Sequence, residues 1–341
     1  MCLNRCLADD APVRPCHDDR MQASGKNAGL GLALVSACAF GGSGVAAKPL
    51  IEAGLDPLHM VWLRVAGAAL VLSPLAWRHR ALVRRKPLLL AGFGLVAVAG
   101  VQAFYFASLS RIPVGVALLL EYLGPALLLG YIRFVQRKPV TRAAAAGAAV
   151  AVAGLACVVE IWAGLRLDLF GVLLGLAAAC CQAFYFVFAD QGADAEDAPD
   201  PLGVIAHGMI VGALVMTVIA RPWRIDWQVL GGDAAMGDLR VPALALLAWV
   251  VLVATVFAYL TGVVSVRRLS PQVAGVVACL EAVVATVLAW VLLGEQLSGP
   301  QVLGGALVLG GAFIAQSSRP APVVAQEAPL PPVQDREPSS A

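Results

Sequence analysis

Residues 87–134 read PLLLAGFGLVAVAGVQAFYFASLSRIPVGVALLLEYLGPALLLGYIRF, and this stretch decides the fold. Two apolar runs, 87–108 and 112–133, are separated only by a short turn that ends at Pro113. Each run holds the roughly 20 residues that an α-helix needs to cross the hydrocarbon core of a bilayer. In that core the backbone satisfies its hydrogen bonds only within helices or closed barrels, so the stretch predicts two adjoining transmembrane helices.

The same pattern recurs along the whole chain. Of its 341 residues, 60% are apolar and 13% are charged, whereas a soluble domain carries about 25% charged residues. The net charge of +2 is too small to indicate a nucleic-acid partner. We therefore predict an all-α integral membrane protein with disordered tails over 1–27 and 318–341. Its ten predicted transmembrane helices cover 28–47, 57–76, 87–108, 112–133, 142–160, 169–189, 201–220, 241–264, 271–293 and 300–317.

Lysine and arginine counts predict the orientation, because cytoplasmic loops carry an excess of them. With both termini cytoplasmic, 17 basic residues lie inside and 6 outside. Two loops run against this pattern: 190–200 should be inside but has no basic residue, and 221–240 should be outside but has three. The bias of the first half favours cytoplasmic termini.

An internal repeat divides the chain. Shifted by 157 residues, 89–154 aligns with 246–311 without a gap and with 14 of 66 positions identical. Thr141 and Ser298 then both stand where a helix favours an N-cap. The units 28–160 and 169–317 would each hold five helices, so the second unit would enter the membrane inverted. Inverted repeats are typical of secondary transporters, with the solute site near the midplane where the repeats meet.

Charged residues inside the predicted spans are the clearest functional candidates, because each costs about 2.5–3.5 kcal/mol or more at the bilayer centre. Glu121, Glu281 and Arg64 lie well inside their spans. Arg64 and Glu121 come at similar depths, so we expect them to pair across a central cavity. A carboxyl group in such a cavity could load and release a proton as access alternates. The alternative is a buried salt bridge that only fixes helix packing.

Further polar side chains within the predicted spans could hydrogen-bond a solute, although each could equally join helices or lie at the membrane interface. These candidates are Gln102, Tyr105, Gln182, Tyr185 and Tyr259. Lys48 is most simply an interfacial anchor, and His207 a packing residue. The glycines of 142–160 and 300–317 favour close helix packing, either within the fold or in a homodimer contact.

The sequence contains no motif typical of a catalytic site or of a metal site. The eight cysteines form no Cys-x-x-Cys pair, the four histidines are scattered, and His-Glu-x-x-His is absent. We therefore expect no catalytic residues, no metal site and no cofactor. Residues 1–25 lack the apolar core of a signal peptide, and Met21 is an alternative start.

Several motifs together resemble the EamA-type branch of the drug/metabolite transporter superfamily over residues 28 to 317. They are Arg-Ile-Pro-Val-Gly-Val-Ala at 111–117, Leu-Glu-Tyr-Leu-Gly-Pro at 120–125, Leu-Leu-Gly-Glu-Gln-Leu-Ser at 292–298, and Arg64 within Trp-Leu-Arg-Val-Ala-Gly. Cys-Leu-Glu-Ala at 279–282 is similar to the family's Leu-Glu-Pro element, but Ala282 replaces the usual proline. Glu295, in the Gly-Glu motif, is interpreted as structural.

Within that family, the first two motifs look most like the threonine/homoserine exporter group. The resemblance implies ten helices in two inverted repeats in the cell membrane. It also implies export of amino acids or related small polar metabolites, driven by proton exchange. Two alternatives remain open: a drug or nucleotide-derivative efflux carrier of the same fold, and, more remotely, a membrane-embedded enzyme.

Overall fold

The computed structural model describes residues 16–137, 139–160, 167–193, 199–266 and 271–317. Within these ranges, the side chains of 16–28, 185–193, 266, 271–279 and 316–317 are not described. The two predicted tails therefore lie mostly outside the described residues.

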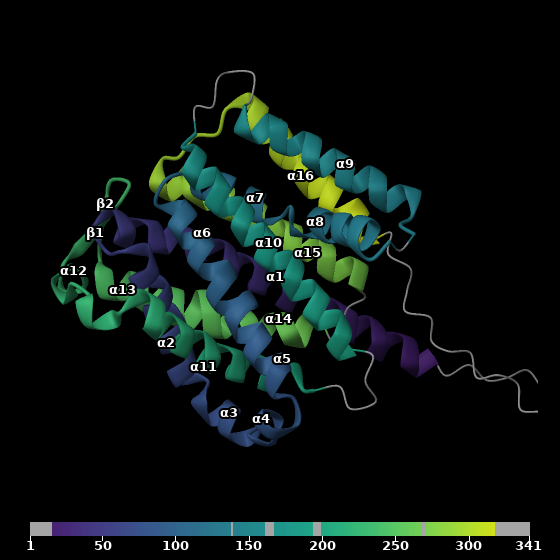
Figure 1. The fold of residues 1–341 in the computed structure, drawn as a ribbon, viewed down its shortest axis with the longest axis horizontal. Helices are drawn as coiled ribbons and strands as arrows, with labels where there is room; N and C mark the ends of the chain where they lie inside the picture. Colours follow the sequence, from purple (N-terminus) through teal and green to yellow (C-terminus); the bar gives the residue numbers. More distant parts are fainter. Residues whose placement is uncertain (1–15, 138, 161–166, 194–198, 267–270, 318–341) are drawn as a thin grey trace, which may run out of the picture.

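Helices make up nearly the whole described chain (Figure 1). In the first half they are α1 (Cys16–Glu52), α2 (Pro57–Val71), α3 (Ser73–Arg78), α4 (Ala81–Arg85), α5 (Pro87–Gly92), η1 (Phe93–Gly100), α6 (Val101–Leu109), α7 (Val114–Glu121), α8 (Gly124–Gly130), η2 (Tyr131–Val135) and α9 (Arg142–Val159). In the second half they are α10 (Leu169–Ala193), α11 (Pro201–Ala220), η4 (Pro222–Arg224), α12 (Trp227–Gly231), α13 (Ala243–Ala248), η5 (Trp249–Phe257), α14 (Ala258–Val266), α15 (Pro271–Leu293) and α16 (Gly299–Ser317). The strands β1 (Asp233–Met236) and β2 (Leu239–Pro242) form one antiparallel hairpin.

Apolar helices occur in all ten predicted ranges. Among the described residues, six helical segments are long and apolar enough to cross a membrane: 29–52, 87–109, 114–135, 142–159, 201–220 and 243–265. Four shorter apolar segments cover 57–71, 169–184, 280–293 and 299–315. Ten membrane crossings therefore remain a prediction, while the helical, multi-pass character is clear.

Two predicted helix boundaries need correction. Helix α1 begins at Cys16, so residues 16–27 are helical and not a disordered tail; they include good helix formers such as Met21, Gln22 and Ala23. The helix predicted over 57–76 already ends at Val71, because Pro74 has no N–H to continue the hydrogen-bond ladder.

The hairpin β1–β2 was missed in a chain predicted to be all-α. Residues 241–242, assigned to a helix, belong to its second strand. The Gly237–Asp238 pair connects the two strands, and Gly237 has φ +58°. A Gly-Asp pair between two strands is a typical hairpin signal. Here the two strands have only four residues each and lie mostly within a predicted loop, so the signal was overlooked.

The helix predicted over 112–133 has a break in its hydrogen-bond ladder at its centre, a turn whose residues Tyr122 and Leu123 keep right-handed helical angles, whereas its counterpart in the second half is continuous. Helix α7 ends at Glu121 and α8 begins at Gly124, with Pro125 in its first turn. Proline lacks the N–H that would bond to the carbonyl four residues earlier, and its ring clashes with that carbonyl. Helix α15 runs unbroken past Ala282, the position where the family usually has proline.

Local features recur at equivalent positions of the two halves. The π-helical segments η1 and η5 nearly coincide after the 157-residue shift, and π-helix is rare in proteins. Arg137 and Gly294 correspond to each other and both have left-handed φ values, 55° and 69°. Thr141 accepts a hydrogen bond from the Ala144 N–H, and Ser298 accepts one from the Gln301 N–H. Both predicted N-caps are therefore confirmed.

Helices α9 and α16 lie side by side along one edge of the molecule (Figure 1). A Cβ added at Gly147 would come within 2.7 Å of the Gly311 carbonyl oxygen, and one at Gly154 within 2.7 Å of the Gly304 carbonyl oxygen. In the 157-residue repeat alignment Gly147 corresponds to Gly304 and Gly154 to Gly311, so the two contacts are equivalent. The two helices thus meet across a local pseudo-twofold relationship that needs glycine for the backbones to touch.

The loops predicted to share the outer side meet at one end of the helices. Lys48 contacts Glu295, Arg111 contacts Asp168, and Ser298 contacts Glu160. At the same end, Gly237 of the hairpin packs against the Leu292 carbonyl. This clustering agrees with successive helices that cross in alternating directions.

Candidate functional site

Arg64 is held in a buried socket between helices of the two halves. Its side chain projects from α2, and the residue is only 3% exposed. Nε donates to Thr255 Oγ1 at 2.8 Å and one terminal nitrogen donates to Ser43 Oγ at 2.6 Å. The other terminal nitrogen lies 3.4 Å from the Ala254 carbonyl oxygen. Arginine presents several donors in a rigid fork, so these contacts fix its orientation.

The π-helical segment η5 supplies much of this socket. Thr255 Oγ1 donates to the Val250 carbonyl at 2.7 Å while it accepts from Arg64. The guanidinium also lies 5.4 Å from the centre of the Phe106 ring, at cation–π distance. The structure thus explains how a cation is retained deep inside an apolar helix bundle.

Glu121 is the last residue of α7, at the break before α8. The break follows from Pro125, so the sequence motif itself sets the carboxylate at an interrupted helix. In transporters, discontinuous helices commonly form solute and ion sites near the midplane. The residue is half-buried.

Glu281 lies inside the continuous helix α15 and is also half-buried. Its carboxylate accepts a hydrogen bond from the Tyr122 hydroxyl at 3.4 Å. Helix α1 passes close by, because a Cβ at Gly41 would lie 2.9 Å from the Glu281 carbonyl oxygen. Glu281 therefore faces the helix break through Tyr122.

The three charges form one electrostatic cluster. The charge of Arg64 acts on both Glu121 and Glu281, and the two carboxylates act on each other. The direct pair that we expected between Arg64 and Glu121 is not formed: within the described part of the chain, the guanidinium bonds hydroxyls and a carbonyl. Instead, the hydroxyl groups of Ser43 and Thr255 accept the hydrogen bonds of the Arg64 guanidinium. One fixed cation thus faces two carboxylates at longer range.

Three of the polar candidates lie beside this cluster. Tyr105 is buried, and its hydroxyl lies 2.6 Å from the position that a Cβ would take at Gly44, the residue after Ser43. Tyr259 lies on α14, which directly follows the η5 segment that bonds Arg64, and it packs edge-on against Phe40 of α1, with ring centres 4.9 Å apart. The Gln182 side chain packs on Gly124, directly after the helix break.

The remaining two candidates are less well connected. The Gln102 Oε1 atom is buried without a hydrogen-bond partner among the described residues; Gln102 precedes Tyr105 by three residues and so lies on the same side of α6. The side chain of Tyr185 lies outside the described residues. His207 bonds the Gly203 carbonyl of its own helix at 2.8 Å, as a packing residue would.

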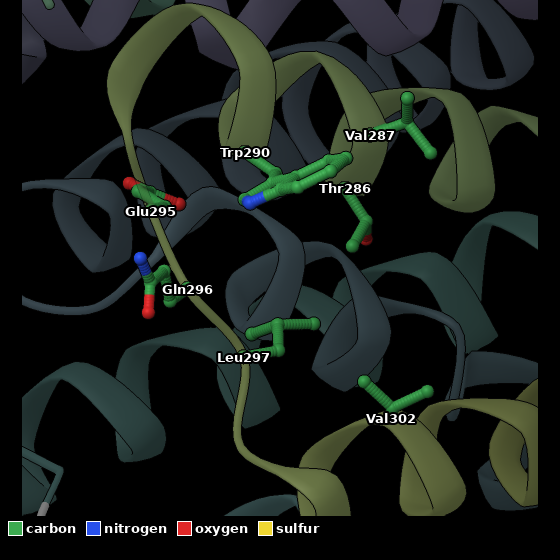
Figure 2. Close-up of a pocket in the computed structure, with 7 residues that line it drawn as sticks. All are labelled: Thr286, Val287, Trp290, Glu295, Gln296, Leu297 and Val302. Atoms are coloured by element: carbon green, nitrogen blue, oxygen red, sulfur yellow. The ribbon is translucent and has the colours of Figure 1, made fainter.

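Four contributors to the cluster were not predicted: Ser43, Thr255, Tyr122 and Phe106. Tyr122 follows Glu121 directly and could have been suspected from the motif. The others gave no signal, because single hydroxyls and aromatic rings are common in transmembrane helices. A hollow of about 430 Å³ lies elsewhere, at the C-terminal end of α15 (Figure 2), and it is lined by none of the predicted site residues whose side chains are described. Among the described residues, no group of three potential ligands could hold a metal ion.

The EamA-like transporter family matches the chain twice, over residues 27–160 and 169–316. The chain belongs to the EamA-like transporter family. It is a multi-pass integral membrane protein of the drug/metabolite transporter type.

Individual relatives point the same way. The threonine/homoserine exporter RhtA of Escherichia coli K12 is 30% identical over 251 residues, which cover 72% of this chain and 77% of the relative. The RhtA protein of Salmonella typhimurium LT2 is 30% identical over 246 residues, covering 71% and 75%. One solved crystal structure aligns with a TM-score of 0.54 at 20% identity, covering 85% of this chain and 97% of the other; this likeness concerns the fold alone.

Proposed function

We propose that this EamA-like transporter is a secondary exporter of amino acids of the threonine/homoserine kind, or closely related small polar metabolites, and that it exchanges them for protons. It would act in the cell membrane, with ten helices in two inverted repeats and both termini in the cytoplasm. The observation that carries the proposal is the cluster formed by the buried Arg64 and the half-buried Glu121 and Glu281, which lies where helices of both halves meet.

The charge balance of the cluster suits a zwitterionic solute. One cation and two carboxylates leave an excess negative charge when all are ionised. Either a proton or a solute ammonium group would compensate it, and both would compete for the same carboxylates. Because Arg64 is tied to Ser43 and Thr255, it would act as a fixed countercharge and as a partner for a solute carboxylate.

The polar neighbours extend the same site. The tyrosine hydroxyls of Tyr105 and Tyr259 and the amides of Gln102 and Gln182 would hydrogen-bond the solute. Tyr185 stays a candidate on sequence grounds alone. The resemblance to curated threonine/homoserine exporters supports the solute class, and the helix break at Glu121 supports transport.

The test is transport by the purified protein in proteoliposomes with an imposed pH gradient. Radiolabelled threonine and homoserine should accumulate against their gradients, and a protonophore should abolish the accumulation. Accumulation that persists when the proton gradient is collapsed would exclude proton exchange. If no amino acid moves but an amphipathic drug or a nucleotide derivative does, the solute class is wrong and the alternative efflux reading takes its place.

A further inference from the structure

An ion pair between the two halves lies outside the proposed solute site. Lys48 Nζ lies 2.5 Å from Glu295 Oε1, and both side chains are largely buried, with 15% and 13% of their surfaces exposed. The second oxygen of Glu295 accepts a hydrogen bond from the Val114 N–H at 2.9 Å. One carboxylate thus ties together the C-terminal part of α1, the first turn of α7 and the loop after α15.

These are the helices that carry or border the charged cluster. Helix α7 ends at Glu121, α15 carries Glu281, and α1 supplies Ser43. Lys48 and Val114 belong to the first family match and Glu295 to the second. A solute that left the cluster toward this end would come to the ends of α1 and α7, which the carboxylate of Glu295 holds together.

The chemistry of the contact suits a reversible closure. A partly buried ion pair gains little net stability, because desolvation of the charges offsets their attraction. The Val114 N–H belongs to the first turn of a helix and has no partner within it, so water can replace the carboxylate there. Both contacts can therefore open when water enters, at small cost in free energy.

Space for such an opening exists next to the contact. Figure 2 shows Glu295 at the margin of the hollow, on the extended segment that joins α15 to α16. Trp290 and Thr286 of α15 line the hollow on one side, and Val302 of α16 lines it on the other. The segment is thus not fully packed, and Gly294, with φ +69°, precedes Glu295.

We propose that Lys48, Glu295 and the Val114 N–H form the latch that closes the outer end of the transport path, and that the latch opens once in each cycle. The outer assignment rests on the proposed orientation, and the cycle rests on the proposed function. The structure then corresponds to a state closed on this side.

The first test measures a distance and needs no knowledge of the solute. Spin labels are attached at cysteines that replace the exposed residues Ala53 and Gln296, in a variant without native cysteines. Lys48→Met combined with Glu295→Gln keeps the side-chain sizes but removes both charges. This double variant should shift part of the distance distribution to longer values. An unchanged distribution would overturn the latch.

A matched control comes from the same end of the molecule. Arg111 and Asp168 also form an ion pair, at 2.9 Å, but their side chains are 44% and 37% exposed. Arg111→Gln with Asp168→Asn should leave the distance distribution as in the parent. If this control shifts it equally, any lost charge opens this end and the latch is not specific.

The second test locks the latch in the transporting protein. Cysteines at positions 48 and 295 are joined by a bismaleimide with a reducible spacer. Cross-linking should stop flux, reduction should restore it, and each single-cysteine variant should be unaffected by the reagent. Full flux in the cross-linked protein would overturn the latch. If the parent protein, with Lys48 and Glu295 intact, moves no solute at all, the proposed function fails, and the distance measurement still decides the latch.

Discussion

Tyr122 donates a hydrogen bond to the Glu281 carboxylate across 3.4 Å, and it is the residue directly after Glu121. One tyrosine thus connects the carboxylate of the second half to the broken helix of the first. Binding of a proton or solute at one carboxylate would change the affinity of the other, since the two also interact electrostatically. We therefore treat Glu121 and Glu281 as one functional unit.

Neutralising either carboxylate should remove proton dependence. Glu121→Gln and Glu281→Gln keep the side-chain shape but cannot exchange a proton, so solute flux should no longer respond to an imposed pH gradient. Initial rates in proteoliposomes at several internal pH values measure this. Glu52→Gln, at an exposed position at the end of α1, is the control and should behave as the parent. A preserved pH response in Glu121→Gln would remove that residue from the mechanism.

Loss of Arg64 should destabilise the protein as well as stop transport. Arg64→Ala removes the cation that faces the two carboxylates and leaves the buried Ser43 hydroxyl without its hydrogen-bond partner, and one such unsatisfied buried group costs about 1–3 kcal/mol. Thermal unfolding in detergent measures the loss. Adding Glu121→Gln should recover part of that stability, because it removes one of the uncompensated charges. Strictly additive losses would show that the two residues do not share a site.

Arg64→Lys separates charge from geometry. Lysine keeps the positive charge but cannot bond Ser43 and Thr255 with the same planar fork. We expect stability close to the parent and clearly reduced flux, measured in parallel by thermal unfolding and by transport. Normal flux would mean that charge alone matters, and the hydroxyl socket would then have no positioning role.

A single methyl group should disturb the contact between α9 and α16. In Gly154→Ala the new Cβ would lie 2.7 Å from backbone atoms of Gly304 and Val308. Overpacking of this kind costs about 1–3 kcal/mol. Gly310→Ala in the same helix pair is the control, because nothing lies within 4 Å of its Cβ position. Equal unfolding temperatures for the two variants would argue against the close backbone contact.

The exposed Arg111–Asp168 pair should contribute little. The hydrogen bond from Arg111 lowers the pKa of the Asp168 carboxyl, so any stability that the pair adds is present above the unfolded pKa, near 3.9. It is lost as the pH falls through the lower folded value. Asp168→Asn should therefore unfold at nearly the parent temperature at neutral pH, because water screens exposed pairs. A large loss at neutral pH would contradict this.

The proposed orientation can be tested with two exposed positions. In a variant without native cysteines, Ala53→Cys should react with a membrane-impermeant maleimide in intact cells. Ala81→Cys, on the opposite side, should react only after the cells are permeabilised. The reverse result would place the termini outside and would move the proposed latch to the cytoplasmic side.

Much of this protein was determined by its sequence alone. Long apolar runs admit only helices in a bilayer, and an isolated charge in such a run is too costly to be incidental, so the helices and the candidates Arg64, Glu121 and Glu281 could be predicted. The break in the fourth predicted helix follows from Leu-Gly-Pro at 123–125, because proline removes a hydrogen bond of its own helix. Local N-caps at Thr141 and Ser298 were predictable for the same reason.

Only the tertiary structure determined which side chains form hydrogen bonds and ion pairs between helices. Arg64 is held by Ser43 from α1 and Thr255 from η5, and Glu295 binds Lys48 from the far end of the chain. Periodicity and composition describe one helix at a time, and they contain no information on which helices become neighbours. Contacts between residues about 190 or 250 positions apart along the chain depend on how the two halves pack against each other. That packing, and not the charge pattern, separates the fixed cation from the two carboxylates it faces.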